Sequence, residues 1–382
     1  MQGICDLAGV CSGCPWIEIP YKDQLTRKSV RFMRLWEAEK LPWRHLPFME
    51  VSVREPWGGR DRVDMTIHGE DGTTHFGLYD MQRERILDIG RCPQMSAAVR
   101  PWFDWFREQL PPFQFGHVRL RVAPNGRFGV WLDFPKTLVR DLLREQSWLR
   151  RLLAVAHVEI GQRRETLVVR GEELQLAEPD WLAWFETYLP SGRAVPLYAN
   201  VGSFTQPGFA LNRILVTRVI RAARATAAAA WLELGSGIGN LTLPLAALGT
   251  RVLAVENDRR ACTGLIRSAE EAGLAEAIRI KVANMHRFNP ELVADLGGVD
   301  GVLADPPRSG LRAFLDNLDS QKPEARPRWF LYLSCYAPTL VSDVARLYGL
   351  GYRAARVELL DQFPQSPHAE WLCLLERGGP TP

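Results

Sequence analysis

The chain has 382 residues, of which 46% are hydrophobic, and it carries a formal net charge of +3. Its length is sufficient for two domains, and its composition is that of a globular protein with real cores. No apolar run reaches the roughly 18 residues that a membrane span needs, and the N-terminus does not resemble a secretion signal. We therefore expect a cytoplasmic protein with no membrane partner, whose charge alone gives little support for nucleic-acid binding.

The first 190 residues predict a mixed, largely antiparallel α+β domain. The expected elements are a helix over residues 21–41, short strands over 50–90, a hairpin with strands 117–122 and 127–134, a helix over 137–154 and a strand pair over 156–178. The hairpin turn is expected at Asn125-Gly126, a dipeptide typical of tight turns. Arg119, Arg121 and Arg127 alternate with apolar residues, so we expect one face of the hairpin to be basic.

Four of the seven cysteines, Cys5, Cys11, Cys14 and Cys92, lie in this first part. In a cytoplasmic chain such crowding indicates metal binding more than disulfides. By spacing alone, the set is compatible with zinc or with an iron–sulphur cluster.

The pattern changes near residue 191. A strong helix over 211–229 is followed by alternating strands and helical or loop segments. The expected strands are 231–235, 251–256, 277–282, 299–305 and 329–335, with two more at 352–360 and 370–376. This rhythm predicts a parallel, doubly wound, Rossmann-like sheet. The predicted fold class is therefore α/β, with an α+β domain over 1–190 and a doubly wound domain over 191–382.

Polar and glycine residues follow the first four strands of this predicted sheet. A glycine-rich turn begins at Gly235, and Glu256 ends the next strand, where a carboxylate can accept hydrogen bonds from ribose hydroxyls. Asn284 ends the third strand, where it could meet an adenine edge, and Asp305 ends the fourth. An NAD site is the alternative, but the rigid Asp-Pro-Pro-Arg loop at 305–308 favours S-adenosylmethionine (AdoMet).

Cys335 ends the fifth strand and is the candidate nucleophile. Carbon 5 of a pyrimidine is too weak a nucleophile to take a methyl group until a thiolate adds at carbon 6. A buried structural cysteine is the alternative. If the last strand runs antiparallel, Glu370 lies near Cys335 as a general base, and His368 competes for that role because its solution pKa suits neutral pH.

With these residues the chain resembles the RNA uracil-5-methyltransferases, which make 5-methyluridine in 23S ribosomal RNA or transfer RNA. The resemblance covers nearly the whole chain. Leu333-Ser334-Cys335 matches the nucleophile motif of that family, and His368-Ala369-Glu370 matches the segment with its general base, which favours Glu370. Ser203–Pro207 resembles its Phe-x-Gln segment, which implies that Gln206 contacts AdoMet, and Gly235, Glu256 and Asp305 match its other cofactor positions.

The cysteine set resembles the [4Fe–4S] site of the ribosomal-RNA branch, which implies a structural cluster on Cys5, Cys11, Cys14 and Cys92. It also implies 23S ribosomal RNA as the favoured substrate, with transfer RNA as the alternative, and we expect a monomer. The family pattern is broken at Gly208 and Tyr336, where asparagine is usual, and at Gly59–Arg62, where an aromatic-Arg-Asn-Arg arm is usual. These departures put the substrate in doubt.

The resemblance implies that the N-terminal domain grips the RNA, with Arg60 and Arg62 as phosphate or base contacts. Because carbons 5 and 6 are hidden in a duplex, the enzyme must bind a loop or flip the target nucleotide out. Two other functions are compatible with parts of this pattern. One is a non-catalytic iron–sulphur RNA-binding protein, and the other is a cytosine-5 methyltransferase.

Overall fold

The structure is a computed structural model that describes residues 5–42, 47–51, 55–70, 72–83, 85–287 and 298–378. Residue contacts divide the chain into two compact units that interleave along the sequence. The first unit contains residues 1–20, 55–186 and 198–211, and the second contains 21–54, 187–197 and 212–382. The division into continuous domains over 1–190 and 191–382 remains a prediction, because contacts do not test which segments fold independently.

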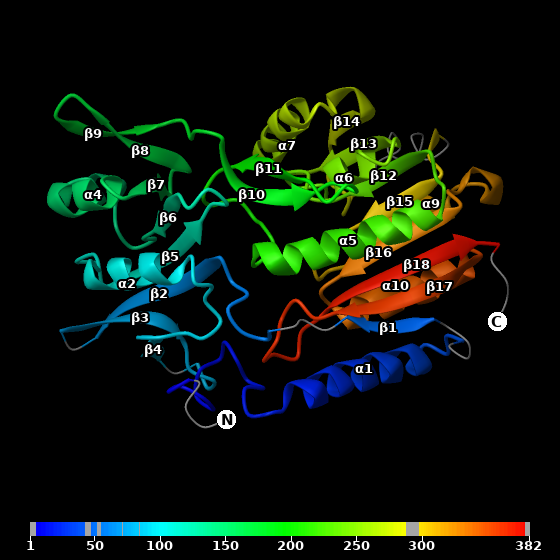
Figure 1. The fold of residues 1–382 in the computed structure, drawn as a ribbon, viewed down its shortest axis with the longest axis horizontal. Helices are drawn as coiled ribbons and strands as arrows, with labels where there is room; N and C mark the ends of the chain where they lie inside the picture. Colours follow the sequence, from blue (N-terminus) through cyan, green and yellow to red (C-terminus); the bar gives the residue numbers. More distant parts are fainter. Residues whose placement is uncertain are drawn as a thin grey trace. The chain divides into compact units, whose positions relative to one another are not determined.

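The second unit is built on one eight-stranded sheet (Figure 1). Its strands are β1 (Phe48–Val51), β12 (Ala230–Leu234), β13 (Arg251–Glu256), β14 (Ile278–Val282), β15 (Gly301–Ala304), β16 (Trp329–Ser334), β17 (Tyr352–Leu360) and β18 (Glu370–Arg377). The strand order is β1-β17-β18-β16-β15-β12-β13-β14. Neighbours are parallel except at β18, which runs antiparallel to both β16 and β17. The predicted α/β doubly wound class is confirmed.

Helices cover both faces of this sheet. They are α1 (Tyr21–Ala38), α5 (Phe209–Ala225), α6 (Thr242–Ala246), α7 (Arg259–Ala272), α9 (Arg312–Asp319) and α10 (Ala337–Gly349), with short 3-10 turns at Ala275–Ala277 and Pro323–Ala325. Phe330 and Tyr332 point into a core with α1, α9 and α10, whereas Leu331 and Leu333 point into a core with α5 and α6. This alternation is the period of two that a strand imposes.

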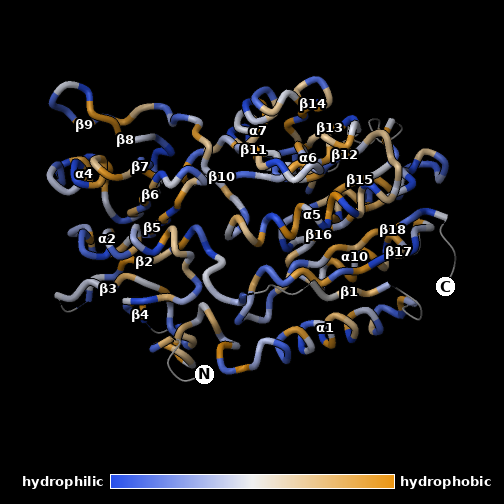
Figure 2. Tube along the Cα trace, in the orientation of Figure 1, coloured by the Kyte–Doolittle hydropathy of each residue, from blue (hydrophilic) through white to orange (hydrophobic). Residues whose placement is uncertain are grey.

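α1 and β1 precede the rest of this unit by more than 130 residues, and β1 closes the edge of its sheet at β17. Leu25, Phe32 and Trp36 recur on one face of α1 and are buried against the sheet. Figure 2 shows the matching alternation of hydrophobic and hydrophilic residues along the helix. The helix predicted over 21–41 is therefore confirmed, but its packing partner was not predictable from local periodicity.

The first unit has an eight-stranded, mainly antiparallel sheet in the order β4-β3-β2-β5-β6-β7-β8-β9. Its strands are β2 (Arg62–Glu70), β3 (Thr73–Tyr79), β4 (Ile86–Asp88), β5 (Phe115–Val122), β6 (Phe128–Asp133), β7 (Ala156–Ile160), β8 (Glu165–Arg170) and β9 (Glu173–Ala177). Its helices are α2 (Arg100–Glu108), α3 (Val139–Leu142) and α4 (Gln146–Leu153). Two further strands, β10 (Leu182–Tyr188) and β11 (Ala194–Ala199), pair with each other.

Three local predictions for this unit need correction. The helix expected over 137–154 is two short helices, because Glu145 between them has a non-helical backbone. The strand pair expected over 156–178 is three strands. α2 was not predicted, although Pro101 in its first turn is a helix-start signal. No helix among the described residues is long and apolar enough to span a membrane.

Candidate active site and cofactor-binding edge

In the second unit, the candidate site residues lie along one edge of the sheet. β18, β16, β15, β12, β13 and β14 are successive neighbours. Gly235, Glu256 and Asn284 lie at or just beyond the carboxyl ends of β12, β13 and β14, and Asp305 and Cys335 follow β15 and β16. This is the edge where open α/β sheets bind ligands.

The turn after β12 is shaped by glycines. Gly235, Gly237 and Gly239 all have φ in the left-handed region, at 80°, 55° and 97°. A Cβ on Gly235 would lie 2.9 Å from the carbonyl oxygen of Asp305, so the two loops approach closely there. A Cβ on Gly237 would meet nothing within 4 Å, so the outer side of the turn is open.

Glu256 is held by backbone amides. Its Oε1 accepts hydrogen bonds from the amides of Asn257 and Asp258 at 2.7 and 2.8 Å, and its Oε2 accepts one from Gly237 at 2.9 Å. A carboxylate has about four lone-pair positions, so this fixed group can still accept a hydrogen bond from a ribose hydroxyl. Asn284 Oδ1 accepts a hydrogen bond from the amide of His286, which fixes its side chain beyond β14.

Cys335 and Glu370 are brought together by strand register. β16 and β18 pair antiparallel, with Ser334 opposite Trp371. Cys335 is the next residue beyond Ser334, and Glu370 is the residue before Trp371, so the two are neighbours across the strands. Asp305, which follows the adjacent β15, is close enough to raise the pKa of both groups.

Burial and like charge dominate the electrostatics of this group. Burial and the neighbouring Asp305 raise the pKa of Glu370 well above its ordinary value. Burial raises the pKa of Cys335, Glu370 and Asp305 raise it further, and a hydrogen bond from Arg308 opposes them. His368 is exposed as a residue, but partial desolvation of its ring, together with nearby cations, lowers its pKa. The environment therefore shifts the two candidate bases in opposite directions, raising the pKa of Glu370 and lowering that of His368.

The loop after β15 is anchored by Asp343 of α10. Asp343 Oδ2 accepts hydrogen bonds from the amide of Leu311 at 2.8 Å and from the hydroxyl of Tyr332 at 2.7 Å. Gly310 has φ 74°, and a Cβ there would lie 2.6 Å from the Asp343 carboxylate. This anchor holds the loop that carries Asp305 and Arg308.

The segment before Glu370 is held by α1, a contact that sequence reasoning missed. Lys28 Nζ donates to Asp361 Oδ1 at 2.7 Å and to the carbonyl of Phe363 at 3.1 Å. Gln24 donates to the Gln365 side chain at 2.7 Å and accepts from its amide at 2.8 Å. No local signal pointed to these contacts, because the partners are more than 330 residues apart.

A cavity of about 50 Å³ lies beside Cys335. Its lining comes from α1, from the start of α10 and from the segment before β18, and it includes Lys28, Arg31, Phe32, Cys335, Tyr336, Pro367, His368 and Trp371. Cys335 is partly exposed, so its thiol is accessible from this side.

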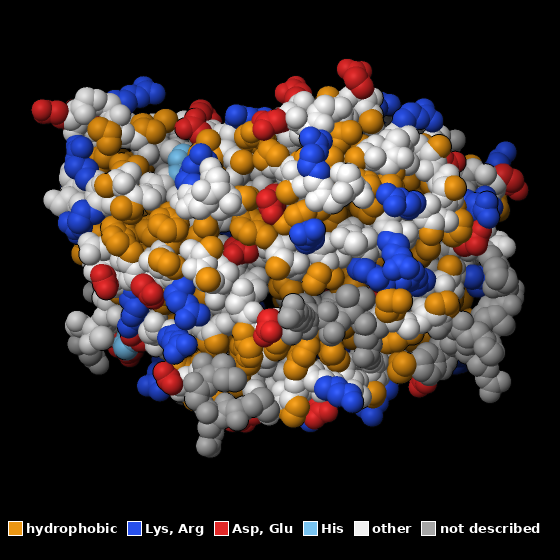
Figure 3. All heavy atoms as spheres, in the orientation of Figure 1, with side chains coloured by type: hydrophobic (Ala, Val, Ile, Leu, Met, Phe, Trp, Pro, Cys, Tyr) orange, Lys and Arg blue, Asp and Glu red, His pale blue; other side chains and the backbone are white. Residues whose placement is uncertain are grey.

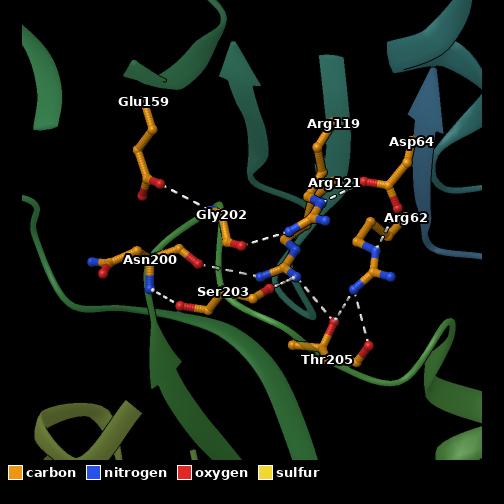
Figure 4. Close-up of polar contacts among 9 residues, drawn as sticks. All are labelled: Arg62, Asp64, Arg119, Arg121, Glu159, Asn200, Gly202, Ser203 and Thr205. Carbon is orange, nitrogen blue, oxygen red and sulfur yellow. Dashed lines mark hydrogen bonds and ion pairs between the residues drawn. The ribbon is translucent and has the colours of Figure 1, made fainter. Parts of the chain in front are cut away.

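Gln206 belongs to the first unit, on a loop over residues 200–206 that arginines hold (Figure 4). Arg121 donates to the carbonyls of Asn200 and Ser203 and to Thr205 Oγ1, at 3.3, 2.8 and 3.0 Å. Arg62 also donates to the Thr205 carbonyl, at 2.9 Å. Gln206 itself is buried.

The basic hairpin face expected from the sequence is therefore wrong in part. Arg121 is only 2% exposed, and Arg119 donates to Asp64 and to the carbonyl of Gly202, both at 2.5 Å. These guanidinium groups are used within the first unit, because they satisfy loop carbonyls that would otherwise lack partners. Arg127 is exposed.

Two departures from the family pattern are in contact with each other. A Cβ on Gly208 would lie 1.8 Å from the carbonyl oxygen of Gly59, so the asparagine usual there cannot fit. Asp61 accepts a hydrogen bond from the amide of Phe209 at 2.8 Å, and its own amide donates to Pro207 at 3.1 Å. The residues at 59–61 and the glycine at 208 therefore depend on each other, because they pack directly against one another. Tyr336 caps α10 and lines the Cys335 cavity.

Cys5, Cys11, Cys14 and Cys92 line one largely apolar cavity of about 50 Å³ in the first unit. Burial raises the pKa of Cys11, Cys14 and Cys92, and charge repulsion from other members of the set raises it further. Among the described residues, however, no group of three or more His, Cys, Asp or Glu side chains is arranged to hold a metal ion.

The strand order of the second unit, its open glycine turn and the acidic group ending β13 define the fold of an AdoMet-dependent methyltransferase. Residues 186–378 match the family model described as tRNA (Uracil-5-)-methyltransferase. An uncharacterized RNA methyltransferase (Bd2056) of Bdellovibrio bacteriovorus is 40% identical over 98% of this chain and 95% of its own length. The 23S rRNA (uracil(1939)-C(5))-methyltransferase RlmD of Cupriavidus necator is 28% identical over 98% of this chain and 85% of its own length.

Among solved structures, the tRNA (uracil-54, C5)-methyltransferase of Pyrococcus abyssi in complex with S-adenosyl-L-homocysteine superposes with a TM-score of 0.66. The two sequences are 20% identical, and the match covers 96% of this chain and 86% of the Pyrococcus chain. At that identity, the likeness supports the fold. The chain belongs to the RNA uracil-5-methyltransferase family, and it is an AdoMet-dependent enzyme that acts on RNA. Membership of this family supports an enzyme over the non-catalytic RNA-binding protein, and uracil over cytosine as the target base.

Proposed function

We propose that this enzyme methylates carbon 5 of a specific uridine in 23S ribosomal RNA through a covalent bond between Cys335 and carbon 6. The observation that carries the proposal is the register that makes Cys335 and Glu370 neighbours, with Asp305 beside them. The 23S ribosomal RNA substrate is supported by the similarity to the Cupriavidus 23S rRNA methyltransferase and by the four cysteines that line one cavity. Transfer RNA is the second candidate, favoured by the substrate of the Pyrococcus enzyme.

In this mechanism, Cys335 gives its proton to solvent and its sulphur bonds to carbon 6, which moves the electron pair of the carbon 5–carbon 6 double bond toward carbon 5 and the carbon 4 oxygen. AdoMet, when bound, supplies the methyl group that carbon 5 takes. Glu370 then removes the proton of carbon 5, the carbon 5–carbon 6 double bond re-forms, and the Cys335 thiolate leaves. Burial and Asp305 raise the pKa of Glu370, which makes its carboxylate a stronger base for this step.

The groups of the second unit proposed to hold AdoMet are the turn at Gly235, Glu256, Asn284 and Asp305. That Gln206 contacts AdoMet remains what the family resemblance implies. The open side of the glycine turn and the remaining acceptor capacity of Glu256 fit a ligand with a ribose. Burial also raises the pKa of Glu233, beneath this turn, to about 8, so near neutral pH it places little negative charge there.

Covalent trapping tests the catalytic proposal. Incubation with AdoMet and RNA that carries 5-fluorouridine should yield a denaturant-stable protein–RNA adduct, because fluorine cannot leave carbon 5 as a proton does. Cys335→Ser should form no adduct. Glu370→Gln should accumulate an adduct even with unmodified RNA, because carbon 5 is methylated but its proton stays. If Glu370→Gln turned over normally, the base would lie elsewhere, and His368→Gln would be the next variant.

The substrate is tested by mapping 5-methyluridine in ribosomal and transfer RNA from a deletion strain. Loss of one 5-methyluridine from 23S ribosomal RNA supports the proposal. Loss from transfer RNA alone would assign the second candidate. A monomer is expected by light scattering.

We also propose a structural [4Fe–4S] cluster on Cys5, Cys11, Cys14 and Cys92. A single zinc ion needs its thiolates to converge at about 2.3 Å from one point. A cluster binds each thiolate to a different iron, so it accepts a more widely spread set. The cavity of about 50 Å³ is several times the roughly 10–15 Å³ that one water occupies, which is compatible with a group larger than one ion.

Anaerobic purification should give a brown protein with about four irons and four sulphides per chain, and Cys14→Ala should lose the colour. Cys262→Ala is the matched control, because Cys262 is a buried cysteine of α7 outside this set. A colourless protein with one zinc per chain would contradict the cluster.

A further inference from the structure

We infer that the outward face of α1, formed by Arg27, Arg31 and Arg34, binds the phosphodiester backbone of the substrate RNA beside the nucleotide that enters the Cys335 cavity. This face is called the α1 arginine face below. The inference rests on the proposed function for the identity of its occupant. The face itself is defined by charge, exposure and continuity with the cavity.

α1 is one of the basic helices of the second unit. α1 contains five basic and two acidic residues, a net charge of +3, which equals the net charge of the whole chain. The basic residues are Lys22, Arg27, Lys28, Arg31 and Arg34, and the acidic ones are Asp23 and Glu37. α5 is also basic, with four arginines and no acidic residue, so charge alone does not single out α1. What distinguishes α1 is that its exposed arginines lie beside the cavity that contains Cys335.

The three arginines form a stripe on the side of α1 that faces solvent. Their spacing of four and then three residues places them on one helical face, over about 10 Å of axis. All three are exposed, whereas Lys28 and Phe32 between them are buried. Figure 3 shows Lys and Arg side chains along the margin where Figure 1 places α1.

Among the described residues, the three arginines have no carboxylate partner, a property that they share with Arg221 and Arg224 of α5, whereas several other arginines of the unit are paired. Arg218 pairs with Glu358, Arg346 with Asp316, and Arg328 with Glu376. Within the described part of the chain, no carboxylate lies within 4 Å of the guanidinium of Arg27, Arg31 or Arg34. Their guanidinium groups are thus available for phosphate, which they can bind with two parallel hydrogen bonds.

The groove beside this face shares one lining residue, Arg31, with the cavity at the candidate active site. An open groove of about 430 Å³ is lined by Thr26, Arg27, Val30, Arg31, Arg34 and Leu35. Arg31 also lines the cavity that contains Cys335 and His368. An RNA strand whose backbone follows the arginines would therefore lead into that cavity at Arg31. Sequence-specific enzymes bind RNA as splayed single strands of this kind, with the target base turned out of the stack.

The test compares two double substitutions that remove equal charge from opposite faces of the same sheet. Arg27→Gln/Arg34→Gln alters the α1 arginine face. Arg221→Gln/Arg224→Gln alters exposed arginines of α5, whose helix packs in the other core. RNA affinity is measured as a function of salt with an RNA fragment that wild type modifies, or otherwise with ribosomal RNA fragments. Thermal unfolding and AdoMet titration confirm that both variants are folded.

With two lost phosphate contacts, the slope of log K against log salt should fall in magnitude by about 1.4 for a single strand. The affinity should fall about 25-fold at 0.1 M salt, from about 0.7 log units per contact. The α5 variant should keep the wild-type slope. Equal losses in both variants, or none in the α1 variant, would overturn the inference. Unchanged RNA affinity with lost binding to phosphatidylglycerol vesicles would assign the face to a membrane and also overturn it.

Arg31→Gln adds a readout at the cavity. It should weaken RNA binding and also slow adduct formation with 5-fluorouridine RNA, whereas Arg27→Gln should affect binding alone. If wild type forms no adduct, the proposed function fails. The affinity comparison would still decide whether the α1 face binds RNA.

Discussion

The buried ion pair between Lys28 and Asp361 offers a quantitative test of how α1 supports the segment before Glu370. Both side chains have 0% exposure, and Nζ and Oδ1 are 2.7 Å apart. Lys28→Met removes the cation and leaves the Asp361 carboxylate buried without it. Breaking a buried pair in this way costs about 3–5 kcal/mol.

Lys22→Met is the matched control, because Lys22 lies on the same helix but is exposed. It should change the free energy of unfolding by less than about 0.5 kcal/mol. The double variant Lys28→Met/Asp361→Asn removes both charges. The asparagine keeps a side-chain oxygen for the amide of Phe363, which donates a hydrogen bond to Asp361 Oδ1 at 3.2 Å. The double variant should therefore be more stable than the sum of the two single changes predicts, by at least about 2 kcal/mol.

Urea unfolding of wild type, Lys28→Met, Asp361→Asn and the double variant gives the cycle, and the rate of adduct formation with 5-fluorouridine RNA gives the functional effect. Because the pair holds the segment that leads to Glu370, Lys28→Met should also slow turnover of the adduct, and the double variant should restore part of it. If Lys28→Met were as stable as Lys22→Met, or if the single effects were additive, the pair would not stabilise this segment and the reasoning would be wrong.

Other substitutions test separate parts of the structure. Gly208→Ala should destabilise the protein by several kcal/mol or prevent folding, because its Cβ would lie 1.8 Å from a carbonyl oxygen. Gly126→Ala is the control: its Cβ would meet open space, and its φ of 81° should cost only about 1 kcal/mol of unfolding free energy in urea. Arg121→Met should speed proteolysis of the loop over 200–206, because three loop acceptors lose their donor; an unchanged cleavage rate would contradict this. Wild type should lose stability as pH rises from about 4.5 to above 8, because over that range Glu233 ionises in the unfolded chain, whereas burial raises its folded-state pKa to about 8. Glu233→Gln should flatten the dependence of unfolding free energy on pH, and parallel curves for the two proteins would refute the assignment. Arg308→Met should move the pH midpoint of adduct formation upward, because Arg308 opposes the raised pKa of Cys335.

The C-terminal sheet was predictable because its information is local. Each buried parallel strand is a short apolar run that ends at or just before a residue such as Gly235, Glu256 or Asp305. Because the carboxyl ends of parallel strands meet at one edge of a sheet, these residues lie along that edge. The final strand was expected to bring Glu370 near Cys335 if it ran antiparallel, and the structure has that direction. The roles of these residues remain predictions, because geometry alone does not show turnover.

The arginines of the first unit were harder to interpret from sequence. An arginine that alternates with apolar residues predicts an exposed face, and Arg121 follows that pattern on β5. It is buried because the loop over 200–206 folds onto it and supplies carbonyl partners, a contact about 80 residues away along the chain. Periodicity along a strand cannot reveal that a distant loop covers it.

The same limit bears on where the catalytic part of the chain begins. The family model matches residues 186–378, which suggests a self-contained C-terminal domain. However, Gln24 and Lys28 of α1 hold residues 361–365, and β1 pairs with β17, so residues 21–51 complete the unit that contains Cys335. A fragment that starts at residue 186 would keep the glycine turn and Cys335 but would leave Asp361 buried without its cation. The N-terminal helix is therefore part of the catalytic unit in space, although it lies far from that unit in sequence.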